Sequence, residues 1–194
     1  MISLEWVSDY IDISDQDLKE LAVKITQSGI NVEKVITNHI DNLVIGKVIS
    51  CVDHPDSDHL HVCMVDVGKS EAIQIVCGAP NVREGLKVIV SLPGAVLPGN
   101  FEIKKGKIRG VESNGMICAL YELGLEEKND ETYAKGIEEL NSDAKVGEDP
   151  IKYLGLDDTL YELDIHKHRN NDCYYHIGFA YEIGAILNRR VVLP

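Results

Sequence analysis

The feature that most constrains the fold is a series of short, β-branched segments that begins at Leu43. They are LVIGKVISCV, HLHVCMVDVG, AIQIVCG, KVIVSL and FEIKKGKI. Turn-forming Gly, Pro, Asp and Asn residues separate them, and no stretch between them has the length or period of a helix. Several segments alternate apolar and polar residues, as half-buried antiparallel strands do. Strands at such close spacing predict a small all-β barrel or sandwich.

The N-terminal flank has a different pattern. Leu4, Val7 and Ile11 follow a helical period, and a second helix is predicted to begin at the N-cap Ser14 and to end at Gly29. The segment NVEKVI that follows predicts a strand. Together these elements form only part of a core.

The C-terminal flank repeats this mixture of helix and strand. Pro150 predicts the start of a short helix, TLYELDI predicts a strand, and DCYYHIGFAYEIGAIL predicts a helix capped by Asn171 or Asp172. The loop His166–Arg169 before that cap either orders the helix start or docks a partner or RNA. The predicted apolar face of the helix consists of Ile177, Ala180, Tyr181, Gly184 and Leu187.

Neither flank has enough apolar surface to fold alone, so we predict that they form one domain. The predicted fold is α+β and all-β: a small α+β domain from residues 1–39 and 151–194, with a five-stranded OB-fold β-barrel of residues 40–150 inserted into it. Within the barrel region, GIEEL is a candidate closing strand and EEKNDETYAKG a solvated loop. Three small consecutive units are the alternative arrangement.

Composition and charge exclude several classes of protein. The 194 residues carry a formal net charge of −13, so the long-range field repels phosphate and argues against indiscriminate nucleic-acid binding. We expect neither DNA nor a membrane as a partner. No apolar run has the length of a membrane span, and the first residues lack the apolar block of a signal peptide. Five cysteines without a CxxC pair predict buried thiols in a reduced, cytoplasmic protein.

One basic segment, FEIKKGKIRGVESNGMICA, stands out from this acidity. Lys104, Lys105, Lys107 and Arg109 are crowded into it. In a strand, Lys105, Lys107 and Arg109 would share one face at a pitch of roughly 7 Å, which matches the phosphates of a nucleotide chain. Lysines also protect edge strands from aggregation, and charge alone does not separate these two interpretations.

The residues after the cations favour a nucleic-acid contact. Ser113 supplies a hydroxyl, Asn114 an amide, and Gly115 permits close approach of the backbone. Met116 supplies a polarizable side chain that packs on a base or sugar.

The segment HPDSDHLHVC is rich in metal-binding residue types, but it lacks a second cluster of ligands. We therefore expect no metal there. His59, His61 and Cys63 are predicted to share one strand face, and the two histidines are alternative RNA contacts. Pro55 and its neighbouring aspartates fit a turn equally well.

Motifs for catalysis are missing from the sequence. It contains no GxxxxGK[ST], no GxGxxG and no GxSxG. No catalytic residue is predicted.

Three long motifs resemble the tRNA-binding OB domain of the bacterial phenylalanyl-tRNA synthetase β chain. Related domains occur in methionyl-tRNA synthetase extensions and in stand-alone tRNA-binding proteins. The motifs are VIGKVISCVDHPDSDHLHVCMVDVG, QIVCGAPNVREGLKVIVSLPGAVLPG and IKKGKIRGVESNGMICALYELGL. Both flanks, ISLEWVSDYIDIS…LAVKITQSGINVE and LYELDIHKHRNNDCYYHIGFAYEIGAIL, are similar to the first domain of the same β chain.

The resemblance implies an N-terminal part of a much longer ligase subunit. The family enzyme is an α2β2 tetramer that attaches phenylalanine to tRNA with ATP and Mg²⁺, so the implied partners are tRNA, the α subunit and a second β subunit. Its active and editing sites lie outside this region, and no cofactor is expected here. Carried over by motif, the implied tRNA contacts are Lys105, Lys107, Arg109, Ser113 and Met116, to which the residue types add Lys104, Asn114 and His59.

The chain departs from the family pattern at His59, where Lys or Arg is frequent, and near Met64, where a basic residue is common. The loop after the last strand reads HKHRNND instead of the usual TPNRxD. Two other functions fit the same residues: a free-standing tRNA-binding protein, and a barrel that braces the synthetase tetramer.

Overall fold

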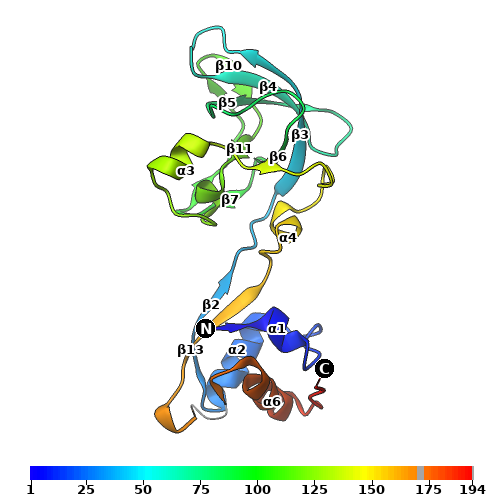
Figure 1. Cartoon of the computed structure of the whole chain (residues 1–194), viewed down its shortest axis with the longest axis vertical. Coiled ribbons are helices and arrows are strands. Elements are labelled where there is room, and N and C mark those ends of the chain that lie inside the picture. Colours follow the sequence, from blue (N-terminus) through cyan, green and yellow to red (C-terminus); the bar gives the residue numbers. More distant parts are fainter. Residues whose placement is uncertain (170–172, 194) are drawn as a thin grey trace. The chain divides into compact units, whose positions relative to one another are not determined.

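The computed structural model describes residues 1–169 and 173–193 and forms two compact units (Figure 1). Unit 1 is Met1–Asn38 together with Leu156–Pro194, and unit 2 is His39–Gly155. The later boundary between the two units was predicted at residue 150. It lies further along because the short helix α4 (Pro150–Tyr153) belongs to unit 2, where Ile151 is part of the core.

Unit 2 is built on a curled antiparallel sheet with the strand order β11-β6-β3-β4-β5 (Figure 1). In β4, Cys63 and Val65 are fully buried whereas Met64 between them is partly exposed, so the predicted alternation is present. The strands are β3 (Leu43–Asp53), β4 (His61–Asp66), β5 (Ile73–Cys77), β6 (Lys87–Ser91) and β11 (Met116–Cys118).

The sheet is OB-like, but among the described residues its strand ladders do not close it into a barrel. Other hydrogen bonds join its two ends. The Asn114 N–H donates to the Gln74 carbonyl at 2.8 Å, and the Gln74 side-chain amide donates to the Glu112 carbonyl, also at 2.8 Å. GIEEL does not close the barrel, because it forms β12 (Glu139–Leu140), which pairs with β6.

The prediction of one continuous strand for FEIKKGKI is wrong. It is divided into β8 (Phe101–Glu102), which pairs with β7 (Val96–Leu97), and β9 (Gly106–Ile108), which pairs with β10 (Val111–Ser113). The division occurs where Ile103 buries its side chain in the core.

The acidic segment predicted to be a solvated loop contains the helix α3 (Asp130–Lys135). A capping box explains its start: the Thr132 N–H donates to the Asn129 side chain, and the Asn129 N–H donates to the Thr132 hydroxyl, both at 2.9 Å. Directly after β11, the chain forms a single 3₁₀ turn, η1 (Leu120–Leu123).

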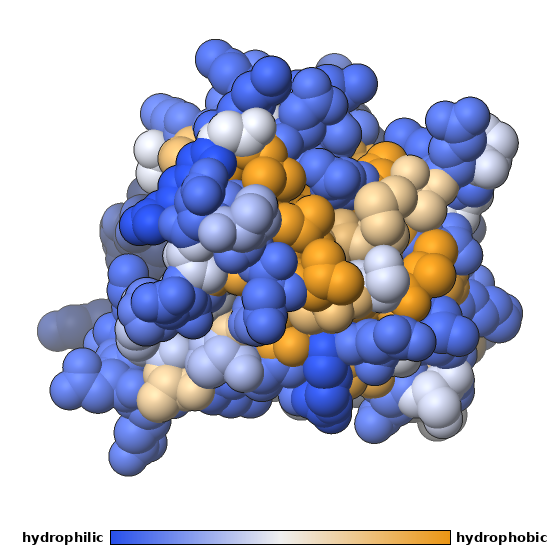
Figure 2. All heavy atoms as spheres, turned by 90° about the horizontal axis from the view of Figure 1, so that it is seen from above, coloured by the Kyte–Doolittle hydropathy of each residue, from blue (hydrophilic) through white to orange (hydrophobic). Residues whose placement is uncertain are grey.

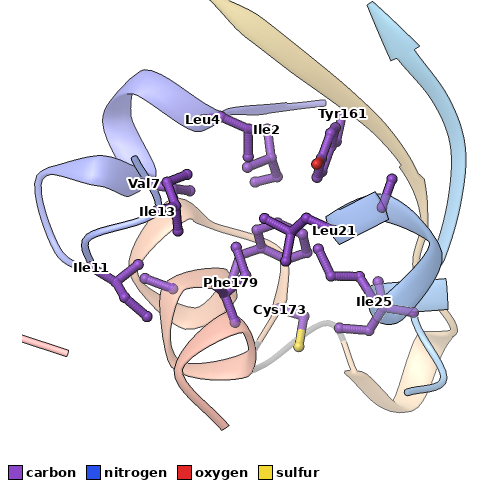
Figure 3. Packing of buried hydrophobic residues seen from close by; sticks show 14 residues of the cluster. Ile2, Leu4, Val7, Ile11, Ile13, Leu21, Ile25, Tyr161, Cys173 and Phe179 are labelled. Carbon is purple, nitrogen blue, oxygen red and sulfur yellow. The ribbon is translucent and has the colours of Figure 1, made fainter. Parts of the chain in front are cut away.

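Unit 1 packs helices against one face of a sheet with the strand order β1-β13-β2 (Figures 1 and 3). In the core, the rings of Tyr161 and Phe179 form a T-shaped pair with 6.4 Å between their centroids. The elements are β1 (Ile2–Ser3), α1 (Leu4–Ser8), α2 (Leu18–Gln27), β2 (Asn31–Thr37), β13 (Thr159–Asp164), the 3₁₀ turn η2 (Lys167–Arg169) and α6 (His176–Leu187).

Helix α2 begins later than predicted. Its N-cap is Asp17, whose carboxylate accepts the Lys19 and Glu20 N–H groups, whereas Ser14 bonds to Asp12. A charged carboxylate at the helix start gains from the macrodipole, which favours Asp17 over the serine. Gly29 follows the helix with φ 110°, as predicted.

The predicted apolar face of helix α6 is confirmed at Ala180, Gly184 and Leu187 and is wrong at Tyr181. Phe179 and Ile183 are buried, while Tyr181, predicted to face the core, is exposed. Gly184 is packed closely, because a Cβ there would lie 2.9 Å from the Arg189 carbonyl oxygen. The predicted caps Asn171 and Asp172 lie outside the described residues. In the loop before them, Arg169 pairs with Glu182 of α6.

None of the helices in the described part of the chain has both the length and the apolarity to cross a membrane. The five cysteines are free thiols, and all except Cys51 are buried. Burial raises the pKa of Cys77 to about 11, which keeps that thiol protonated near neutral pH.

Candidate nucleic-acid interface

The basic residues lie around a two-stranded hairpin formed by β9 and β10. Ile108 pairs with Val111, so only Arg109 and Gly110 form the turn. Both have positive φ, 47° and 85°. A two-residue turn with this backbone matches the twist of the flanking strands and favours glycine at its second position. The sequence RG between short β segments is the local cause of the hairpin.

The predicted row of cations on one strand face is wrong. Lys105 precedes β9 in irregular backbone, Lys107 is the middle residue of β9, and Arg109 lies in the turn. The spacing of these three cations is therefore not the regular spacing of side chains on one face of a strand. The cations are still gathered on one hairpin and on the segment that leads into it.

The cations differ in their partners. Lys104 forms a 2.9 Å ion pair with Glu102, and the hydrogen bond from this pair raises the pKa of Lys104. Within residues 1–169 and 173–193, no ion pair involves Lys105 or Lys107, and both are exposed. Glu112 lies opposite Lys107 in the hairpin register and is the nearest acidic neighbour by pairing. Lys105 and Lys107 are thus the cations most available to an anionic ligand.

Ser113 anchors the base of the hairpin. It is only 5% exposed. Its hydroxyl oxygen accepts the Val76 N–H at 3.1 Å, and the hydroxyl donates to the Gly115 carbonyl at 3.0 Å. The predicted RNA contact therefore has two partners inside the protein, which fix the hairpin to β5.

Asn114 and Met116 lie beyond the base of the hairpin. Asn114 is half-buried and holds β5 through its backbone N–H. Met116 pairs with Ser91 across β11 and β6, and its side chain packs against the core cluster that contains Ile89 and Leu97. The structure does not bring Met116 into line with the lysines.

The tip of the hairpin is attached to the loop between β3 and β4. His54 is only 4% exposed, and its Nε2 lies 3.2 Å from the Ile108 carbonyl oxygen. The Asp56 N–H donates to Nδ1 of His54 at 3.0 Å, and the Arg109 guanidinium donates to the Asp56 carbonyl at 2.8 Å. Sequence reasoning identified a turn here but missed His54 as its centre. The pair HP directly after a strand was the available signal.

The predicted alignment of His59, His61 and Cys63 on one strand is wrong, because β4 begins at His61. His59 is exposed in the preceding loop, and His61 lies 3.3 Å from Asp53. Cys63 is fully buried. No group of residues suited to hold a metal ion occurs among those that the structure describes.

Apolar side chains of unit 2 are exposed as well, and one of them, Ile108, follows Lys107 directly in β9. Ile49, Val52 and Ile108 are exposed, and Val52 pairs with Val62 across β3 and β4. Ile49 is exposed because a bulge interrupts β3 between Val48 and Ser50. On the face of the protein seen in Figure 2, hydrophobic side chains gather centrally and hydrophilic ones surround them. At the hairpin itself, exposed Lys107 and Ile108 are adjacent, and such a combination suits a nucleotide chain, because phosphates pair with lysines while bases and sugars cover apolar groups.

Comparison with known proteins identifies the family of this region. The sequence model described as "Putative tRNA binding domain" matches residues 43–149, from the first strand of the sheet to the residue before α4. This match covers more than half of the 194-residue chain.

Curated relatives match the whole chain. The phenylalanine–tRNA ligase beta subunit of Geobacillus kaustophilus (strain HTA426) is 50% identical over 197 residues. Those of Bacillus cereus (strain ZK / E33L) and Bacillus subtilis (strain 168) are 47% identical over 196 residues. Each alignment covers 100% of this chain and 24% of the relative, so the chain spans about a quarter of their length.

A solved structure of a MetRS related protein from Pyrococcus horikoshii gives a TM-score of 0.39 at 23% identity, over 54% of this chain and 84% of that one. So low a likeness supports no statement about fold or function. The match of the family model to residues 43–149, in contrast, identifies the family: the chain belongs to the tRNA-binding domain family.

Proposed function

We propose that this chain is the N-terminal part of a phenylalanine–tRNA ligase β subunit and that unit 2 binds tRNA. The observation that carries the proposal is the alignment of the whole chain with such subunits at 47–50% identity. In the proposed parent enzyme, a cytoplasmic α2β2 tetramer, ATP and Mg²⁺ act at a site outside this chain. Unit 2 then contributes affinity for tRNA, and not chemistry, to the attachment of phenylalanine.

We further propose that unit 2 works as a closed five-stranded OB barrel. Support comes from the hydrogen bonds that Gln74 of β5 makes with Glu112 and Asn114, at the position where a ladder between β5 and β11 would close the sheet. In OB folds the face of the second and third strands and the two loops beside it bind oligonucleotides. Here those loops are the β3–β4 loop and the segment that carries the β9–β10 hairpin.

Lys105 and Lys107 supply the main phosphate contacts in this proposal, because both are exposed and neither has an ion pair among the described residues. Arg109 adds charge at the hairpin tip, where one guanidinium nitrogen is already bonded to Asp56. Contacts to phosphate position the ligand without reading its sequence, so the expected selectivity among tRNAs is low.

The remaining predicted contacts have smaller proposed roles. Lys104 contributes little because Glu102 neutralises it. His59 is exposed in the β3–β4 loop, and Asn114 lies at the base of the hairpin. Ser113 and Met116 support the binding surface from within.

The proposal is tested by measuring the Kd of the 194-residue chain for a phenylalanine tRNA transcript. We expect the double variant K105A/K107A to weaken binding by about tenfold. The matched control is K19A/K24A, which removes the same charge from exposed positions on α2. Equal Kd values for the two double variants would reject this surface as the tRNA site.

A structural brace is the competing function, and the complete ligase separates the two. Deletion of residues 39–155 should raise the KM for tRNA while the subunits still assemble. Loss of assembly with unchanged tRNA affinity would show that unit 2 braces the enzyme instead.

A further inference from the structure

A buried histidine connects the β9–β10 hairpin with the loop between β3 and β4. With Nδ1 of His54 accepting the Asp56 N–H at 3.0 Å, the ring proton is assigned to Nε2, which donates to the Ile108 carbonyl at 3.2 Å. One ring therefore bonds to both segments. Because only 4% of the residue is exposed, His54 has no surface to offer a ligand.

Arg109 makes the second connection between the same segments. Its guanidinium donates to the Asp56 carbonyl at 2.8 Å, so both backbone polar groups of Asp56 take part. We name this set of bonds among His54, Asp56, Ile108 and Arg109 the tip latch.

The hairpin needs such a latch because it is short. Each of its strands has three residues, and a two-stranded hairpin is marginally stable on its own. Ser113 and Gln74 fix only its base. Lys107 lies between base and tip, so its position is fixed only when both ends are held.

We propose that His54 is a positioning residue for tRNA binding. It touches no RNA. Instead, its Nε2 bond holds the hairpin tip, so that Lys105 and Lys107 are presented in a fixed arrangement and lose less conformational freedom when tRNA binds. This inference rests on the proposed function and adds a buried determinant to it.

The simpler role for His54 is to stabilise the turn in its own loop. That role requires only the Nδ1 bond to Asp56, two residues away, whereas the Nε2 bond reaches a residue 54 positions along the chain.

Two substitutions of His54 separate the Nδ1 bond from the Nε2 bond. Glutamine places its amide near Nε2 and retains a donor for Ile108, whereas asparagine places its carbonyl oxygen near Nδ1 and retains only an acceptor for Asp56.

The experiment measures the Kd of the full chain for the phenylalanine tRNA transcript. We expect His54→Gln to bind within about twofold of the parent chain and His54→Asn to bind on the order of fivefold more weakly. The salt dependence of binding should be the same in all three chains, because no phosphate contact is removed. Equal affinity of the two variants, whether both retained or both lost, would overturn the proposal.

A second readout needs no RNA. The backbone order parameter of Gly110, at the hairpin tip, should be lower in His54→Asn than in His54→Gln and the parent chain. If His54→Asn fails to fold, Arg109→Lys keeps the charge but loses the planar guanidinium that bonds to Asp56. It should lower the order parameter of Gly110, and an unchanged order parameter would overturn the proposal; affinity is not used for this variant, because Arg109 is itself a proposed tRNA contact.

The proposed function and the latch fail in different ways. If K105A/K107A leaves the Kd unchanged, the lysine surface is not the tRNA site. If that double variant weakens binding while the two His54 variants behave alike, only the latch is wrong.

Discussion

The cations of unit 1 and those of the β9–β10 hairpin in unit 2 have different partners. In unit 1, three cations are paired with carboxylates from other elements: Lys34 with Glu162, Arg169 with Glu182, and Arg189 with Asp15. In the described residues, Lys105 and Lys107 of unit 2 have no such pair. In a chain with a net charge of −13, lysines without a carboxylate partner are free to bind an external anion. Lys19 and Lys24 of α2 are exposed as well, and among the described residues they too have no ion pair, so the absence of a partner alone does not mark a binding surface. What distinguishes Lys105 and Lys107 is that they lie together on the β9–β10 hairpin and the segment that leads into it.

The largest expected effect concerns the stability of unit 1 alone. Phe179→Ala removes a fully buried ring that packs against Tyr161, and it should lower the free energy of unfolding by about 3–5 kcal/mol. Chemical denaturation measures this loss. At a temperature where the variant is folded, its Kd for tRNA should be unchanged, and a parallel loss of binding would refute the assignment of binding to unit 2.

Charge reversal at the unpaired lysines should give the largest effect on binding. K105E/K107E places two anions where phosphates are proposed to bind, so affinity for tRNA should fall by about 100-fold. Filter binding or fluorescence anisotropy measures the change. K19E/K24E alters the net charge equally on α2 and should have a much smaller effect; comparable losses would show that only the overall charge matters.

Removal of the acidic neighbour should strengthen binding modestly. Glu112 is the register partner of Lys107, so Glu112→Gln removes a competing carboxylate and should improve affinity by about threefold. Glu84→Gln, on an exposed residue between β5 and β6, is the matched control. An unchanged Kd in Glu112→Gln would show that Lys107 does not contact tRNA.

The smallest effect concerns a paired cation of unit 1. The hydrogen bond from Arg189 lowers the pKa of Asp15 in the folded protein below its ordinary value. The pair therefore stabilises the fold above the ordinary carboxyl range and loses this contribution as the pH falls below about 4. Asp15→Asn should make the acid-side loss of stability shallower, with tRNA binding at pH 7 unaltered. If the stability of Asp15→Asn and that of the parent chain depended on pH in the same way, the ion pair between Arg189 and Asp15 would not be formed in solution.

Local pattern was sufficient to predict most elements. Alternating residues around Cys63 and Val65 predicted an antiparallel strand, and Pro150 marked the start of α4. The motifs between Leu43 and Leu125 led to the family that the comparison identifies. These signals are contained in short stretches of sequence, where periodicity and turn chemistry dominate.

Contacts between residues that are distant in the sequence could not be predicted from the sequence. The row of cations failed because burial of Ile103 and the turn at Arg109 interrupt the strand. His54 was missed because its partner Ile108 is distant in sequence, and Ser113 was assigned to RNA although its hydroxyl has partners in the protein. Chemistry-bearing residue types are visible in a sequence, but whether their polar atoms are already occupied depends on the fold.

The most direct test of the account is the salt dependence of tRNA binding by the full chain and by K105A/K107A. Each phosphate contact on single-stranded RNA adds ~0.7 to the slope of log Kd against log salt concentration. Two lost contacts should therefore reduce the slope by about 1.4 relative to the parent chain, while K19A/K24A leaves it unchanged. Equal slopes for K105A/K107A and the parent chain would contradict the claim that these unpaired lysines bind phosphate.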